Sequence, residues 1–218
     1  MITKINVEKW LRERSISFLF PLSTFLLLTA CGSGIPTEYQ EVDKLPEIYP
    51  DYTNVTVPIN IAPLTFEMEK KNTEMAVRFK AGDEEVICNG TKAQPSSDEW
   101  QALKEKAKGK AISVEVFAEN DSQWMRYKPF SIYVSNDSID PYISYRLISP
   151  SYVSYEELTI SQRCLENYDE SVIYNNMLCT TATEGQCINC HNYQQYNPQR
   201  MQFHTRENLG GTVIAYDG

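Results

Sequence analysis

The stretch that decides the fold of the first half of the chain is residues 112–117, which read Ile-Ser-Val-Glu-Val-Phe. Apolar and polar side chains alternate with a period of two, which is typical of a strand with one buried and one solvated face. Residues 55–61, 64–68 and 75–80 alternate in the same way, and three more segments are strand-like: residues 86–88, 124–127 and 130–134. We therefore expect a mainly β domain over residues 53–140.

One helix interrupts these strands. Ser96-x-x-Glu99 is a capping box, and Gly109 suits the position just after a helix. Between them, Trp100, Leu103 and Ala107 recur at helical spacing and form one apolar face. About seven short strands with one helix in a segment of this length favour an immunoglobulin-like β-sandwich.

Residues 1–30 have the pattern of a bacterial lipoprotein signal peptide. Basic side chains up to Arg14 precede the apolar run Ile16–Ala30, which is shorter than the roughly 20 residues that span a bilayer. The run ends in Leu-Thr-Ala-Cys, which resembles the lipobox of bacterial lipoproteins, in which the cysteine is diacylated and becomes the new N-terminus. We expect lipidation at Cys31; the alternative is an ordinary secretory signal with a chance cysteine.

The lipobox implies a location in the cell envelope. Residue 32 is glycine rather than aspartate, which by similarity to enteric lipoproteins favours the outer membrane, facing the periplasm. Residues 31–52 are rich in proline and acidic side chains and are expected to form an extended tether. The formal charge of −9 argues against nucleic acid as a partner, because phosphate binding needs a basic patch. The membrane is the expected partner, through Cys31.

Residues 141–208 carry the chemistry. They are rich in tyrosine and poor in aliphatic runs, so we expect a loop-rich segment with one candidate helix over residues 156–168. Within it, Cys187-Ile188-Asn189-Cys190-His191 is C-x-x-C-H, the attachment signature of c-type haem. Two thiols at this spacing reach the two vinyl groups of one porphyrin edge, and the adjacent histidine becomes the proximal iron ligand. Attachment takes place outside the cytoplasm, in agreement with the signal peptide.

Three other interpretations of the motif remain open. They are a Cys187–Cys190 disulfide with an idle His191, a thioredoxin-like redox pair, and a zinc site completed by Cys164 or Cys179. No βαβ pattern surrounds the motif, which disfavours the redox pair, and no second paired module is present, which disfavours zinc. Covalent haem c is therefore the favoured cofactor.

Candidates for the sixth iron ligand follow the motif. Met201 and His204 are both candidates, and a methionine would raise the reduction potential relative to a second histidine. An open or water-ligated site is the third alternative. Arg200 and Arg206 match the geometry of haem propionates, or are simply solvated.

The remaining cysteines leave a different question open. Cys164 and Cys179 are plausible disulfide partners in an oxidising compartment, which would leave Cys88 as a free, buried thiol.

The chain ends in a strand pattern. Residues 211–216 read Gly-Thr-Val-Ile-Ala-Tyr, and the following Asp217-Gly218 is a hairpin-turn dipeptide with no second strand after it. We expect the chain to be the N-terminal portion of a longer protein.

Four segments together resemble a family of Bacteroidetes lipoproteins: residues 139–148, 167–174, 187–191 and 198–206. Members carry an N-terminal β domain, a C-x-x-C-H segment and a C-terminal TolB-like, WD40-like β-propeller, and are often labelled cytochrome c biosynthesis proteins. The resemblance covers about residues 50–218. It implies that residues 209–218 are the first strand of a propeller that is otherwise missing here.

Two functions from different classes follow. The first is a lipid-anchored protein that binds covalent haem c through Cys187, Cys190 and His191, and that transfers electrons to a redox partner protein or senses redox state. The second is a non-redox envelope protein that binds proteins or glycans, with Cys187 and Cys190 as a disulfide. A remnant of the longer protein is a weaker third interpretation. No catalytic motif stands out, and the sequence leaves open whether the protein is an enzyme.

Overall fold

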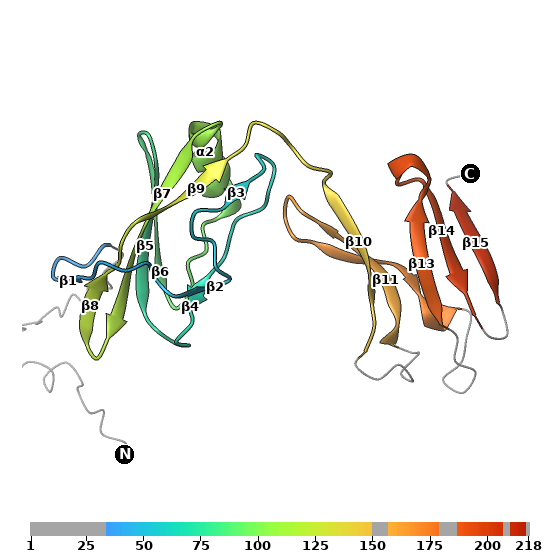
Figure 1. Ribbon diagram of the computed structural model, residues 1–218, viewed down its shortest axis with the longest axis horizontal. Coiled ribbons are helices and arrows are strands. Elements are labelled where there is room, and N and C mark those ends of the chain that lie inside the picture. Colours follow the sequence, from blue (N-terminus) through green and yellow to red (C-terminus); the bar gives the residue numbers. More distant parts are fainter. Residues whose placement is uncertain (1–33, 150–156, 179–186, 207–209, 217–218) are drawn as a thin grey trace, which may run out of the picture. The chain divides into compact units, whose positions relative to one another are not determined.

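The computed structural model describes residues 34–149, 157–178, 187–206 and 210–216 (Figure 1). The expected signal peptide, Cys31, Cys179 and the Asp217-Gly218 turn lie outside these residues. The described chain is mainly β, as expected, and contains one α-helix, α2. No helix in the described ranges is long and apolar enough to cross a membrane.

Most strands of the first half form one seven-stranded sheet. Its long central strand β7 (Ala111–Asn120) pairs antiparallel with β5 (Met75–Ala81), and β5 pairs with β6 (Glu84–Gly90). The other edge of β7 is shared by β8 (Gln123–Arg126) and β9 (Phe130–Val134). Two short strands add to that side in parallel, β1 (Gln40–Glu41) on β8 and β3 (Thr56–Val57) on β9.

The alternation in β7 gives this sheet its buried face. Ile112, Val114 and Val116 are buried, whereas Ser113 is exposed and Glu115 is only half-buried on the solvent side. The turn from β7 to β8 places Asp121 and Ser122 at φ values of 50° and 65°, the left-handed conformations that a tight hairpin turn requires.

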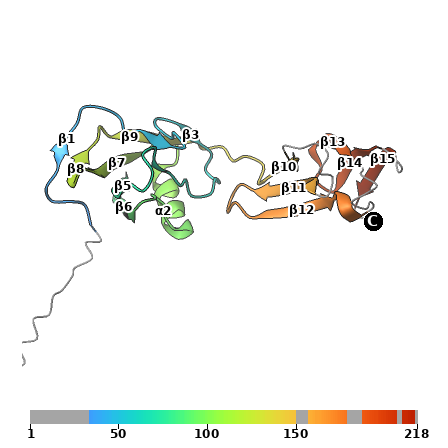
Figure 2. The ribbon, with the colours of Figure 1, turned by 90° about the horizontal axis from the view of Figure 1, so that it is seen from below.

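The helix α2 (Ser97–Ala107) forms as expected. The Ser96 backbone N–H donates to Glu99 Oε2 at 2.8 Å, and the Glu99 N–H donates back to Ser96 Oγ, so the capping box is confirmed. Trp100 and Leu103 are buried against one face of the sheet, where Figure 2 shows the helix. Because the amphipathic spacing and the cap agree, the helix needed no tertiary information to be located.

The immunoglobulin-like sandwich is not confirmed. A second sheet of comparable size is missing from the described residues of this half, where only the two-stranded β2 (Ile48–Tyr49) and β4 (Glu67–Met68) accompany the large sheet. The expectation of a free tether up to residue 52 is also wrong. Ile48 is 3% exposed and belongs to the core, and Gln40 already pairs with β8.

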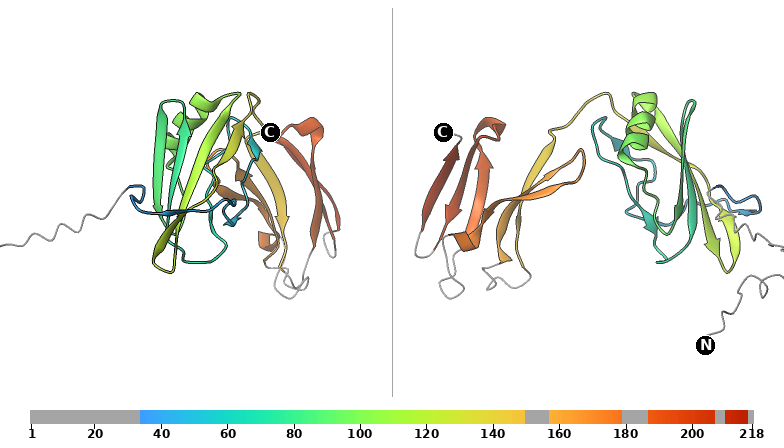
Figure 3. Two further views of the ribbon diagram at one scale, coloured as in Figure 1. Left: turned by 60° about the vertical axis from the view of Figure 1, so that its left-hand side comes forward. Right: turned by 180° about the vertical axis from the view of Figure 1, so that it is seen from behind.

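The second half is not loop-rich, which corrects the expectation for residues 141–208. Two three-stranded antiparallel sheets occupy it, seen from two sides in Figure 3. The first consists of β10 (Tyr142–Leu147), β11 (Thr159–Cys164) and β12 (Glu170–Asn175), and the short 3-10 turn Asn176–Leu178 follows it. The second consists of β13 (Ile188–Tyr193), β14 (Arg200–Thr205) and β15 (Gly211–Tyr216), and the 3-10 turn η3 (Gln194–Tyr196) lies between β13 and β14.

The candidate helix over residues 156–168 is wrong where the chain is described, because Thr159–Cys164 is the strand β11. The strand begins with the β-branched residues Thr159 and Ile160, which favour strands. The expected strand Gly211–Tyr216 is confirmed as β15, but it completes a sheet with β13 and β14 instead of beginning a new one.

A small core joins the two three-stranded sheets. It consists of five buried side chains: Leu158, Ile160, Ile188, Met201 and Phe203. The ring of Tyr174 packs on Phe203 with centroids 4.7 Å apart. Across the same interface, the guanidinium of Arg146 on β10 donates to the carbonyl oxygen of Ile188 on β13 at 3.1 Å. Apolar packing and the hydrogen bond from Arg146 to the Ile188 backbone therefore hold the sheet with the C-x-x-C-H motif against β10–β12.

Candidate haem-attachment hairpin

The C-x-x-C-H motif begins just before β13 and continues into it, opposite β14. Asn189 pairs with His204 and Asn192 pairs with Gln202, so two residues, Cys190 and His191, oppose the single residue Phe203. This is a β-bulge, which adds one residue to a strand and changes the direction in which side chains point. The second cysteine and the histidine of the motif thus occupy the one irregular place in the β13–β14 ladder.

The bulge requires an unusual backbone conformation at Cys190. Its φ is 55°, in the left-handed region, which costs a residue with a Cβ atom about 1–2 kcal/mol. The Asn189 side chain supports the bend, because its Oδ1 accepts a hydrogen bond from the Cys190 N–H at 2.8 Å. Strain of this kind tends to accumulate at functional sites, where the surrounding structure maintains it.

The two thiols of the motif are free and have access to solvent. Cys187 is half-buried, Cys190 is exposed, and no disulfide joins them. The Cys187 carbonyl oxygen accepts a hydrogen bond from the Arg206 N–H at 3.0 Å, which fixes the backbone on which the first thiol stands. His191 is half-buried, and its ring makes no hydrogen bond within the described part of the chain. The donor set is therefore the one that c-type attachment needs: two unpaired, reachable thiols followed by an available imidazole.

The two candidates for the sixth ligand lie on opposite faces of the β13–β15 sheet. Met201 pairs with Tyr193, is 5% exposed and packs in the small core. His204 pairs with Asn189 on one side and Thr212 on the other, and its Nδ1 lies 3.3 Å from Thr212 Oγ1. Positions 201 and 204 differ by an odd number in a strand, so their side chains point to opposite faces. A single iron cannot take both without rearrangement of the strand.

The candidate propionate partners are on the surface. Arg200 and Arg206 are both exposed, and Arg200 Nη1 lies 3.3 Å from Gln194 Oε1. Arg146, which anchors Ile188, was missed by the sequence reasoning. Its position in β10 carries no local signal for a contact with a strand some forty residues later.

The other cysteines are dispersed. Cys164 is buried at the end of β11 and free, and Cys179, its expected partner, lies outside the described residues. Cys88 on β6 is free and half-buried, and its partial burial raises the pKa of its thiol. In the described ranges, no group of three or more histidine, cysteine or acidic side chains is placed to hold a metal ion; Cys179, a candidate fourth zinc ligand, lies outside these ranges.

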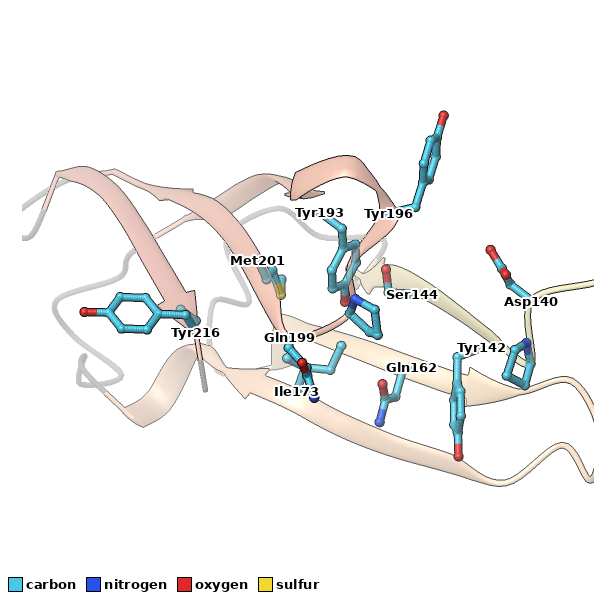
Figure 4. Close-up of a pocket in the computed structure, with 13 residues that line it drawn as sticks. Asp140, Tyr142, Ser144, Gln162, Ile173, Tyr193, Tyr196, Gln199, Met201 and Tyr216 are labelled. Atoms are coloured by element: carbon cyan, nitrogen blue, oxygen red, sulfur yellow. The ribbon is translucent and has the colours of Figure 1, made fainter. Parts of the chain in front are cut away.

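A cavity of about 700 Å³ lies beside the hairpin, between its η3 end and the sheet β10–β12 (Figure 4). Met201 and Tyr193 of the hairpin point toward it. Cys187, Cys190 and His191 do not line it, and neither does any lysine, arginine or histidine among the described residues. The cavity therefore offers no cationic partner for haem propionates.

No protein-family model matches the chain, and no curated protein matches it.

Proposed function

We propose that the protein is a lipoprotein of the cell envelope, anchored through Cys31 in the outer membrane, that carries one c-type haem on Cys187, Cys190 and His191. Its role is electron transfer to a redox partner protein or redox sensing. One observation supports this most directly: both thiols of the motif are free and reachable, and the second, Cys190, shares a β-bulge with the half-buried His191. A structural disulfide would give no reason for a strained cysteine followed by an imidazole without a partner.

Attachment needs no oxidant. Each thiol adds across one vinyl double bond, so that a sulfur–carbon bond forms and the thiol hydrogen goes to the neighbouring vinyl carbon. When bound, haem supplies a one-electron couple at its iron. His191 would be the residue that ligates the iron. The chain's own contribution is to keep the two thiols at their spacing, through the Cys187–Arg206 and Cys190–Asn189 hydrogen bonds.

For the sixth position we favour His204 over Met201. Met201 is buried between the sheets with Phe203. Moving its side chain out of this core would lose the free energy of burying its apolar surface. His204 is half-buried and makes one weak contact with Thr212, so it moves at little cost. A second histidine lowers the reduction potential relative to methionine, so we expect a low-potential haem.

We also infer that the propeller of the resemblance starts earlier than residue 209. Propeller blades are antiparallel sheets that pack face to face. The sheets β10–β12 and β13–β15 are each antiparallel in sequence order and share the small core around Ile160 and Phe203. In this proposal the attachment motif belongs to a blade-like sheet, not to a linker.

The second candidate function is a non-redox binding lipoprotein. The cavity beside the hairpin favours it, because it has the size of a ligand site and excludes the attachment residues. This function does not need haem at all.

Haem content separates the two. The chain is expressed with its own signal in a host with c-type maturation, denatured, and measured by its reduced pyridine spectrum and by haem-stained gels. We expect about one covalent haem per chain, lost in Cys187→Ala and in Cys190→Ala but retained in Cys88→Ala, a matched control elsewhere in the fold. No covalent haem in the unsubstituted chain would reject the redox function and leave the binding function.

A further inference from the structure

The cavity between β10–β12 and the η3 end of the hairpin has an aromatic lining. Four elements supply one tyrosine each: Tyr142 comes from β10, Tyr193 from β13, Tyr196 from η3 and Tyr216 from β15. Tyr142 is 56% exposed and Tyr196 is 92% exposed. Large apolar rings gathered around a concave surface and left open to solvent mark interaction sites.

The polar groups of the lining are almost all neutral. Ser144 and Gln162 come from the sheet β10–β12, and Gln199 comes from the loop after η3. The side chains of Ser144 and Gln199 make no hydrogen bond within the described ranges, and Gln162 uses one N–H on Ser171 Oγ at 3.1 Å. Their remaining donors and acceptors are available to a ligand. Among the residues that the structure describes, Asp140 is the one charged residue that lines the cavity.

The backbone beside the cavity has strained residues that are not part of the hydrophobic core. Gln195 and Tyr196 have φ values of 51° and 59°, two consecutive left-handed residues that both carry a Cβ. Each costs on the order of 1 kcal/mol or more. Neither is buried, so no core packing compensates this strain. The strained turn sets the position of Tyr196 and of the following Gln199, which are the lining residues from this side.

We propose that this cavity binds a neutral, polyhydroxylated ligand, a short oligosaccharide. Tyrosine rings stack on the C–H faces of sugar rings and keep a hydroxyl for hydrogen bonding. Amide side chains both donate to and accept from sugar hydroxyls. The lack of any cation in the lining disfavours phosphate and carboxylate ligands, which arginine and lysine would recognise. The volume of about 700 Å³ accommodates a ligand of several sugar rings.

This site is separate from the haem proposal. The attachment residues Cys187, Cys190 and His191 do not line the cavity, and the one shared residue, Met201, is not the favoured sixth ligand. Sugar binding is therefore expected in protein that carries haem and in Cys187→Ala protein that does not, so either proposal can fail alone.

Saturation-transfer NMR on the full chain tests the site. The probes are linear tetrasaccharides of glucose, mannose, xylose, galactose and N-acetylglucosamine, with tetramethylammonium as a cationic probe. We expect at least one tetrasaccharide to bind, with Kd raised tenfold or more in Tyr142→Ala and also raised in Gln162→Ala. The matched control is Tyr133→Ala, which removes a comparably exposed strand tyrosine from β9, outside the cavity. We expect this control to bind as the unsubstituted chain does.

Three results would overturn the proposal. They are no saturation transfer to any of the five tetrasaccharides, equal weakening of binding in Tyr142→Ala and Tyr133→Ala, and binding of tetramethylammonium alone. The last result would assign the cavity to cations held by tyrosine rings and Asp140. Both tyrosines are exposed, so loss of binding in Tyr142→Ala with an unchanged circular dichroism spectrum reports the site and not a folding defect.

Discussion

The two halves of the described chain are built from the same kind of element but are stabilised very differently. The first half buries twenty-one core side chains between one large sheet, the helix α2 and the short strands. The second half has two complete three-stranded sheets around five buried side chains. Regions with few buried apolar groups open at low free energy, and functional segments are commonly drawn from them. Both the C-x-x-C-H motif and the tyrosine-lined cavity lie in the weakly buried half.

The largest expected effect is in the large core. Phe79 on β5 is fully buried and packs edge-to-face on Trp100 of α2, with ring centroids 6.3 Å apart. Phe79→Ala should lower the free energy of unfolding by about 3–5 kcal/mol, from lost burial and the cavity left behind. Urea denaturation followed by tryptophan fluorescence measures it. A loss below about 1.5 kcal/mol would contradict the assignment of Phe79 to a tightly packed core.

A matched truncation in the small core tests whether the halves open separately. Ile160 on β11 is fully buried between the two three-stranded sheets. Ile160→Ala should lower the free energy of opening of this half by about 2–4 kcal/mol. Amide hydrogen exchange should then accelerate throughout β10–β15. Protection of β5 and β7 should remain as in the unsubstituted chain. If exchange in β5 and β7 accelerated equally, the two halves would be one cooperative unit and the contrast between them would fail.

An ionic cluster on the large sheet gives an intermediate effect that depends on pH. Glu115 on β7 accepts from Arg126 Nη2 at 2.9 Å and from Arg78 Nε at 2.7 Å. Partial burial alone would raise the pKa of this carboxyl, but the hydrogen bond from Arg126 and the charge of Arg78 outweigh it, so the pKa is lowered. Between the usual pKa of glutamate and this lowered pKa, the unfolded chain therefore binds more protons than the folded chain.

The stability that Glu115 contributes is thus fully present above the ordinary pKa of glutamate and is lost as the pH falls through the lowered value. Glu115→Gln should lower the free energy of unfolding by about 1–2 kcal/mol at pH 7, because it removes charge-assisted hydrogen bonds. The difference from the unsubstituted chain should shrink toward pH 3. Urea denaturation at pH 3, 5 and 7 measures this, with Glu119→Gln, a half-buried glutamate on the same strand, as control. A difference that is constant with pH would refute the lowered pKa.

The smallest expected effect is a gain in the stability of the fold when the strained residue of the β13 bulge is replaced. Cys190→Gly places the residue that tolerates positive φ at the strained position and should raise stability by about 0.5–1 kcal/mol. Cys187→Gly, before the strand, should lower it instead, because its thiol is half-buried. The thermal midpoint of the haem-free chain measures both. A loss in Cys190→Gly would mean that the cysteine side chain itself stabilises the bulge.

The sequence was most informative where the structure depends on local rules. The alternation around Val114 located β7, the Ser96–Glu99 box located α2, and the pattern at residues 211–216 located β15. Pairing between distant segments was invisible: the short β1 becomes a strand only because β8 is beside it. The strands β10 and β12 are predicted as loop because this segment has few aliphatic runs, and β11 is predicted as part of a helix over residues 156–168.

The candidate site was predictable in its residues but not in its geometry. Spacing alone identified Cys187, Cys190 and His191. The bulge at Cys190 arises from the register between β13 and β14, and the cavity arises from the packing of two sheets, so neither has a signature in a single segment. The opposite faces of Met201 and His204 follow from the strand period, but only after that stretch is known to be a strand.

The early docking of β1 limits how far the protein can extend from its proposed anchor. Gln40, the first residue of β1, follows Cys31 by nine residues, and a fully extended chain gains at most about 3.6 Å per residue. If Cys31 carries the proposed lipid, a linker of at most about 30 Å separates that lipid from the edge of the large sheet. A domain on so short a linker would stay close to the bilayer surface, where its effective concentration would be high. Under this proposal, a redox partner would have to come to the membrane surface, which favours another membrane-associated protein over a freely diffusing one.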